Sequence, residues 1–256
     1  MIKVVFFDVD GTLVSHTKGE VPASTRKAVS RLKEKGIRCV IATGRYMGEL
    51  EKLPVRDIAF DAYITLNGQL CLDQDQSVLS GAALTGADKE QIIRLFERKE
   101  IPVLLVEKER MYINFVNKKV EKAQREISSD VPDTGEYGGG EIYQAIAYVE
   151  KEKEDELKAI LPDCRITRWN DRAVDIISRG GGKVVGIKQY LEENDILPQE
   201  TMAFGDGEND IEMLEAVGIG IAMGNADDIV KKSADYVTDS VDDDGIGKAL
   251  RHFQVI

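Results

Sequence analysis

Two aspartates two positions apart, Asp8 and Asp10, stand at the end of an apolar run at residues 4–7. The β-branched and aromatic residues of this run predict a buried strand. Alternate residues of a strand point to the same side, so the two carboxylates project together where the strand ends. In an open α/β sheet, ligands bind at this edge. Because converging carboxylates repel each other, the pair calls for a cation or a shared proton.

Further polar residues follow other predicted strands and open a later helix. Apolar runs at 37–42 and 201–204 are followed by Thr43-Gly44-Arg45 and by the stretch Gly205-Asp206-Gly207-Glu208-Asn209-Asp210, and Lys183 begins a helical pattern. Strand ends of a parallel sheet share one edge, so we expect these groups to converge on Asp8 and Asp10.

The expected cluster is rich in carboxylate oxygens, which suit Mg²⁺ rather than zinc. The only two histidines, His16 and His252, are better explained as surface residues. A magnesium ion among carboxylates favours a phosphoryl substrate. Asp8 is then placed to attack phosphorus as a carboxylate nucleophile. Asp10 is placed to protonate the leaving oxygen and later to deprotonate water.

The alternation of strands and helices predicts an α/β fold, a Rossmann-like doubly wound parallel sheet. From about residue 80 the regular rhythm gives way to an α+β pattern, and it resumes after Gly180-Gly181-Gly182. We therefore expect a core built from residues 1–79 and 180–256, with an inserted α+β domain at 80–179.

At these residues the chain resembles the haloacid dehalogenase superfamily of phosphohydrolases, and within it the Cof-like group. The stretch Asp8-Val9-Asp10-Gly11-Thr12 matches the first signature, Thr43-Gly44-Arg45 the second, Lys183 the third, and residues 205–210 the fourth. Further matching features are Asn67-Gly68, Met223-Gly224-Asn225-Ala226, Ala234-Asp235 and Asp244-Gly245. The resemblance covers the core at both ends of the chain and implies that block 80–179 is the cap of this group.

The resemblance also implies roles for the matched residues. Asp8 would be the nucleophile and a Mg²⁺ ligand, and Asp10 would be the acid/base that lends the metal its backbone carbonyl. Thr43 would bind the phosphoryl group, with Gly44 and Arg45 beside it on the substrate. Lys183 would pair with Asp8 and phosphate. Asp206 would complete the metal ligands. Asn209 and Asp210 would support the phosphate, the lysine or the metal. We assign Asn209 to the substrate-binding residues and Asp210 to the metal-binding residues.

Composition excludes several classes of partner. The net charge of −12, from 34 basic and 46 acidic residues, disfavours nucleic acid and anionic membranes. No apolar run approaches the roughly 18 residues of a membrane span. The three cysteines form no CxxC pair. We expect a cytoplasmic enzyme, a monomer or a homodimer, whose partner is a small phosphorylated substrate.

Several alternatives stay open at this point. A phosphosugar mutase would use the same aspartyl-phosphate, and a non-catalytic metabolite-binding regulator would use the same scaffold. Lys183 could be a surface lysine, in which case Lys188 would be the lysine of the site. Arg45 could be a surface charge. The segment 128–140 and the strand ends near Tyr143 and Arg172 are candidates for contact with the leaving group.

Overall fold

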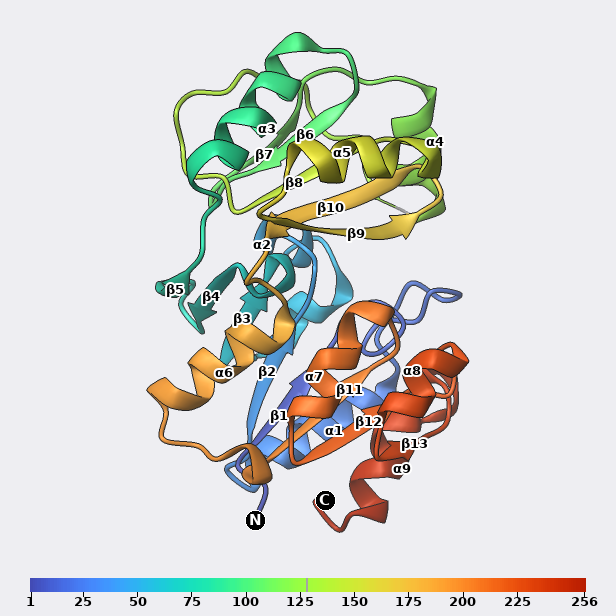
Figure 1. The fold of residues 1–256 in the computed structure, drawn as a ribbon. Helices are drawn as coiled ribbons and strands as arrows, with labels where there is room; N and C mark the ends of the chain where they lie inside the picture. Colours follow the sequence, from blue (N-terminus) through green and yellow to red (C-terminus); the bar gives the residue numbers. More distant parts are fainter. Residues whose placement is uncertain (128) are drawn as a thin grey trace. The chain divides into compact units, whose positions relative to one another are not determined.

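The computed structural model describes residues 1–127 and 129–256, which form two compact units (Figure 1). One unit contains Met1–Ser80 and Gly182–Ile256, and the other contains Gly81–Gly181. The second unit is therefore an insertion in the first, and its limits lie within about two residues of positions 80 and 179. In the described part of the chain, no helix is both long enough and apolar enough to cross a membrane.

The first unit is built on an eight-stranded sheet. In the order of the sheet, its strands are β13 (Tyr236–Val237), β12 (Ile219–Ala222), β11 (Thr201–Gly205), β1 (Val4–Phe7), β2 (Arg38–Ala42), β3 (Ala62–Thr65), β4 (Leu70–Asp73) and β5 (Val78–Gly81). All pairs from β13 to β3 are parallel, whereas β4 runs antiparallel to β3. The expected parallel core is confirmed. The sequence pattern also predicts a hairpin partner at 69–72, after the turn signal Asn67-Gly68, and β4 takes that place.

Helices cover both faces of this sheet (Figure 1). They are α1 (Ala23–Glu34), α2 (Met47–Leu50), α6 (Lys183–Glu193), α7 (Ile211–Ala216), α8 (Asp228–Ser233) and α9 (Gly245–His252). Helix α1 contacts α9, and α7 contacts both α6 and α8. Short 3₁₀ turns add η1 (Pro54–Asp57), η2 (Leu66–Gly68), η4 (Pro198–Glu200), η5 (Glu208–Asp210) and η6 (Val241–Asp243). The expected doubly wound architecture is therefore confirmed.

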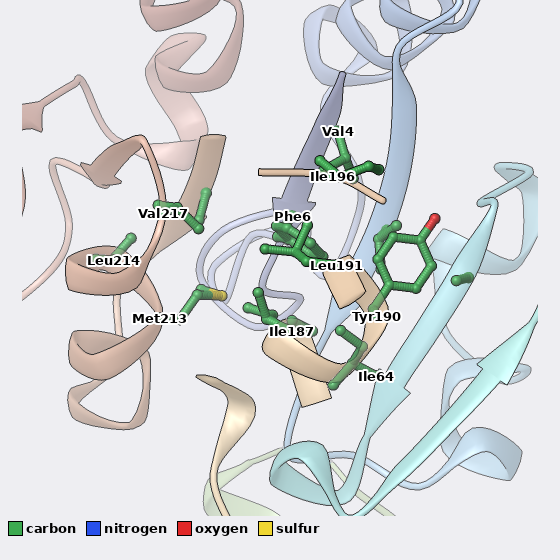
Figure 2. Close-up of a cluster of buried hydrophobic side chains, with 14 of the residues drawn as sticks. Val4, Phe6, Ile64, Ile187, Tyr190, Leu191, Ile196, Met213, Leu214 and Val217 are labelled. Carbon is green, nitrogen blue, oxygen red and sulfur yellow. The ribbon is translucent and has the colours of Figure 1, made fainter. Parts of the chain in front are cut away.

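The central strand β1 directs its alternate side chains to opposite faces. Val4 and Phe6 are fully buried in the cluster that α6 and α7 cover (Figure 2). The ring of Phe6 meets that of Tyr190 edge-on, with centroids 6.0 Å apart. Asp8 is the next residue on this side, so the alternation that buries Phe6 carries Asp8 toward the same layer, where α6 begins at Lys183.

Two local expectations differ from the structure. The sequence pattern at 46–53 predicts a short helix closed by Pro54, but α2 already ends at Leu50. Pro54 instead opens the 3₁₀ turn η1, as a proline can at a first helical position. Strand β5 was not expected, since its residues are mostly exposed and lack an apolar pattern.

The inserted unit has its own five-stranded antiparallel sheet. Its order is β7 (Met111–Ile113), β6 (Val103–Val106), β8 (Gln144–Ala147), β10 (Ala173–Ser178) and β9 (Cys164–Asn170). The helices are α3 (Gly86–Arg98), α4 (Lys118–Glu126) and α5 (Glu154–Ile160), with a 3₁₀ turn η3 (Lys151–Lys153). Ile92 and Phe96 of α3 and Leu157 of α5 share a buried cluster with the sheet. The expected α+β pattern is confirmed.

The candidates for leaving-group contact do not lie together. In the register of β8 and β10, Ala145 faces Ile176 and Ala147 faces Val174. Tyr143, which precedes β8, and Arg172, which precedes β10, therefore lie at opposite ends of this antiparallel sheet. Ser128, the first residue of the candidate segment 128–140, is outside the described residues.

We expect Phe6→Ala to lower the free energy of unfolding by about 3–5 kcal/mol, because it opens a cavity beneath α6. The change is measured by urea denaturation followed by circular dichroism. Leu197→Ala is the control, since Leu197 is 62% exposed and its loss should change stability by no more than about 0.5 kcal/mol. Equal stability of the two variants would contradict the burial of Phe6.

Candidate active site

A buried lysine joins two of the expected carboxylates. Lys183 stands at the first position of α6, and Asp8 follows β1. The Lys183 Nζ lies 2.6 Å from Oδ1 of Asp8 and 2.7 Å from Oδ1 of Asp210. The lysine is only 2% exposed, whereas Lys188 is exposed. Lys183 is therefore the lysine that reaches the strand end.

Asp210 fixes the turn after β11 as well as the lysine. Its Oδ2 accepts hydrogen bonds from the backbone nitrogens of Asp206, at 3.0 Å, and Gly207, at 2.9 Å. The residue is fully buried. With its other oxygen on Lys183, Asp210 ties the turn that carries Asp206 to the start of α6.

Two neutral donors orient the carboxylate of Asp206. Thr12 Oγ1 donates to its Oδ1 at 2.8 Å, and Asn225 Nδ2 donates to its Oδ2 at 3.1 Å. The same Asn225 nitrogen donates to the backbone oxygen of Gly11 at 2.9 Å. A side-chain carbon at Gly11, where φ is +77°, would lie 2.1 Å from Asp206 Oδ2, so only glycine fits there.

Three carboxylates meet at this sheet edge. Oxygens of Asp8, Asp206 and Asp210 all lie within 4.8 Å of one another. Burial raises the pKa of Asp206 to about 6, although the Thr12 hydrogen bond opposes the rise. Burial also raises the pKa of Asp8 well above its usual value; Lys183 opposes this, while the neighbouring aspartates add to it. Three acidic groups facing one ammonium form a cluster that could bind a metal ion.

The carboxylate of Asp10 is paired with an arginine. Arg45 donates from Nε to Oδ2 of Asp10 at 2.6 Å and from Nη2 to Oδ1 at 2.8 Å. Its Nη1 donates to Glu49 Oε1 at 3.4 Å. Burial lowers the pKa of Arg45, but the hydrogen bond and charge of Asp10 and the charge of Glu49 outweigh this and raise it. The alternative of Arg45 as a surface charge is wrong, since its side chain is only 15% exposed.

The turn after β2 supplies a buried hydroxyl. Thr43 is 1% exposed, and its backbone nitrogen donates a hydrogen bond to the backbone oxygen of Ile64 at 2.8 Å. Its Oγ1 accepts a hydrogen bond from the backbone nitrogen of Arg45 at 3.1 Å, which closes the turn around Gly44. Asn209, in the 3₁₀ turn η5 that follows β11, donates from Nδ2 to Asn67 Oδ1 at 3.1 Å.

The structure brings most of the expected residues into one network and adds three others. Asp8, Lys183, Asp206 and Asp210 are directly linked, and Asp10 is joined to Arg45. Thr12, Asn67 and Asn225 bind these groups, although the sequence analysis assigned them no role. The signal available for them was only that each belongs to a short stretch shared with the Cof-like group.

A family model for haloacid dehalogenase-like hydrolases matches residues 5–250. The chain belongs to this family. YkrA of Bacillus subtilis, whose own assignment as a phosphatase is provisional, is 34% identical over 99% of the chain and 98% of its own length.

Solved structures of this hydrolase family agree over the whole chain. The phosphatase BT1666 from Bacteroides thetaiotaomicron is 35% identical, with a TM-score of 0.91 over 100% of the chain and 96% of its own. The subclass IIB sugar phosphatase BT4131 is also 35% identical, with a TM-score of 0.87 over 99% of the chain and 100% of its own. The hydrolase is therefore a phosphoric monoester hydrolase, and its inserted α+β domain is a cap of the kind found in this family.

We expect Lys183→Met to destabilise the protein by about 3–5 kcal/mol, because it leaves two buried carboxylates without their counter-charge. Chemical denaturation at neutral pH measures the change. Lys188→Met on the exposed side of the same helix is the matched control and should remain within about 0.5 kcal/mol of the wild type. A Lys183→Met variant as stable as the control would refute a buried ion pair.

Proposed function

We propose that the protein is a Mg²⁺-dependent phosphatase that hydrolyses a small phosphorylated metabolite through an aspartyl-phosphate on Asp8. The observation that carries the proposal is the environment of Asp8. Lys183 engages Oδ1 of this buried carboxylate at 2.6 Å, so Oδ2 is the oxygen left to attack phosphorus. The neighbouring acidic cluster and the separate Asp10 supply the other two requirements of phosphoryl transfer, charge neutralisation and proton transfer.

The donor set fits a hard divalent cation. Asp8 and Asp206 offer carboxylate oxygens, which Mg²⁺ prefers. Thr12 and Asn225 fix the Asp206 carboxylate in one orientation. Asp210 accepts three hydrogen bonds, one from Lys183 on Oδ1 and two from backbone nitrogens on Oδ2, which favours a supporting role. When bound, Mg²⁺ would neutralise charge on the phosphoryl oxygens.

In the first proposed step, Asp8 Oδ2 forms a bond to phosphorus while the bond from phosphorus to the leaving oxygen breaks. Asp10 transfers a proton to that oxygen. In the second step, Asp10 takes a proton from water, and the oxygen of that water bonds to phosphorus. The bond to Asp8 breaks, and inorganic phosphate leaves. Arg45 keeps the Asp10 carboxyl in one orientation through both transfers.

Thr43, Gly44, Lys183 and Asn209 are proposed to hold the phosphoryl oxygens. For the substrate we propose a sugar phosphate or a similar phosphomonoester, and the full-length likeness to the sugar phosphatase BT4131 supports this class. We propose that residues 80–179 act as the cap that selects the leaving group. We also propose a cytoplasmic setting, in which the three free cysteines stay reduced.

Asp8→Asn should lower phosphate release by at least about 10⁴-fold, because it removes the nucleophile. Release is measured from a generic aryl phosphate and from a panel of phosphorylated metabolites, each with and without Mg²⁺. Asp195→Asn, at an exposed position, is the control and should retain full activity. Retained turnover in Asp8→Asn would remove the nucleophile assignment. Isomerisation of a hexose 1-phosphate without free phosphate would favour a mutase.

The raised pKa of Asp206 predicts that the free energy of unfolding of the metal-free protein depends on pH. The pKa of Asp206 in the folded state, about 6, exceeds the value of about 3.9 expected in the unfolded chain. The folded state therefore binds more protons between these values, and the metal-free protein should lose stability as pH rises through this window. Mg²⁺ should raise the melting temperature most above pH 6.

Asp206→Asn is the test variant for this site. It should stabilise the metal-free protein at neutral pH, because it removes one of three crowded carboxylates, and it should abolish the Mg²⁺-induced rise in melting temperature. Differential scanning fluorimetry with MgCl₂ and with EDTA reads both effects without requiring catalysis. An undiminished Mg²⁺ response in this variant would place the metal elsewhere.

A further inference from the structure

Three consecutive residues between β3 and β4 adopt a left-handed backbone. The φ angles of Leu66, Asn67 and Gly68 are +53°, +53° and +83°. For residues other than glycine this region costs roughly 1–2 kcal/mol each. Leucine in particular has no side-chain hydrogen bond to offset the cost, and such a run persists only where its surroundings determine it.

Backbone hydrogen bonds attach this turn to the loop after β2. The nitrogen of Leu66 donates to the oxygen of Arg45 at 3.2 Å, and the nitrogen of Asn67 donates to the oxygen of Thr43 at 3.0 Å. The turn is therefore built on the two backbone carbonyls that flank Gly44. Any shift of the turn would also shift the loop that carries the Thr43 hydroxyl.

The other side of the turn meets the start of α6. A side-chain carbon at Gly68 would lie 2.2 Å from the backbone oxygen of Gly182, which directly precedes Lys183. Only glycine permits this approach. The left-handed turn thus lies between the loop that carries Thr43 and the helix start that carries Lys183.

The Asn67 side chain reaches a third segment. The residue is 7% exposed, and its Oδ1 accepts a hydrogen bond from Nδ2 of Asn209 at 3.1 Å. A side-chain carbon at Gly44 would lie 3.1 Å from both Nδ2 and Oδ1 of Asn67, so the amide packs closely against that loop. Asn209 itself is exposed, and without this bond its amide would be free to rotate.

We propose that the turn Leu66–Gly68 is a positioning element of the phosphoryl site, and that Asn67 is a positioning residue that acts through Asn209. This inference rests on the proposed phosphatase function. Asparagine meets both demands at this position. It tolerates the left-handed backbone and supplies a neutral acceptor, whereas glycine would supply no acceptor and aspartate would add a negative charge beside a site for phosphate.

Asn67→Gly separates the side chain from the backbone, because glycine keeps the left-handed conformation without strain. We expect its melting temperature to stay at or above the wild-type value. We expect kcat/KM to fall by about 10- to 100-fold and the dissociation constant for orthovanadate to rise by a similar factor. Gln254→Gly is the matched control, since it removes an amide at an exposed residue with φ of +57°, and it should match the wild type in all three measurements.

A double-mutant cycle tests whether Asn67 acts through Asn209. If it does, Asn67→Gly combined with Asn209→Ala should lose no more vanadate affinity than Asn209→Ala alone. Losses that multiply would overturn the inference, as would an Asn67→Gly variant that binds vanadate like the wild type. Absence of phosphate release by the wild type would refute the proposed function. Vanadate binding is measured by calorimetry and needs no turnover, so it tests the role of Asn67 even in that case.

Discussion

The candidate active site depends on one buried ammonium group. Lys183 lies between Asp8 and Asp210 with almost no access to water. Removing these charges from water is costly, and the pairing offsets that cost only when its geometry is good. The end of β1, the start of α6 and the turn after β11 must therefore come to fixed positions together, and Asp206 is carried with them.

The two N-terminal aspartates show how neighbouring side chains give two identical groups different surroundings. Asp8 is buried against a lysine, whereas Asp10 lies on Arg45, which is in turn paired with Glu49. Two carboxylates one strand period apart therefore have different partners and different access to water. In the proposed reaction, this difference in surroundings suits one carboxylate to nucleophilic attack and the other to proton transfer.

The sequence predicts those residues of the site that directly follow a strand. Apolar runs that stop at Asp8, Thr43 and Asp206 place these residues at one sheet edge, because parallel strands end together. The pairing of Arg45 with Asp10 and the bonds of Asn225 could not be predicted, since they join loops whose approach depends on packing. The left-handed turn at Leu66 was equally hidden, because leucine gives no signal for that backbone. Strand β5 could not be predicted either, because it is exposed at the sheet edge and its residues lack the apolar pattern of a buried strand.

The insertion of Gly81–Gly181 into the first unit has a consequence for how the protein is made. Strand β1 pairs on one side with β2 and on the other with β11, which is synthesised after the whole inserted unit. During translation the insertion can fold as a unit while one edge of β1 still lacks its partner. Asp8 then has neither Lys183 nor Asp206 beside it. A chain released early would therefore carry Asp8 without the ion pair and the neighbouring carboxylates that surround it in the complete fold.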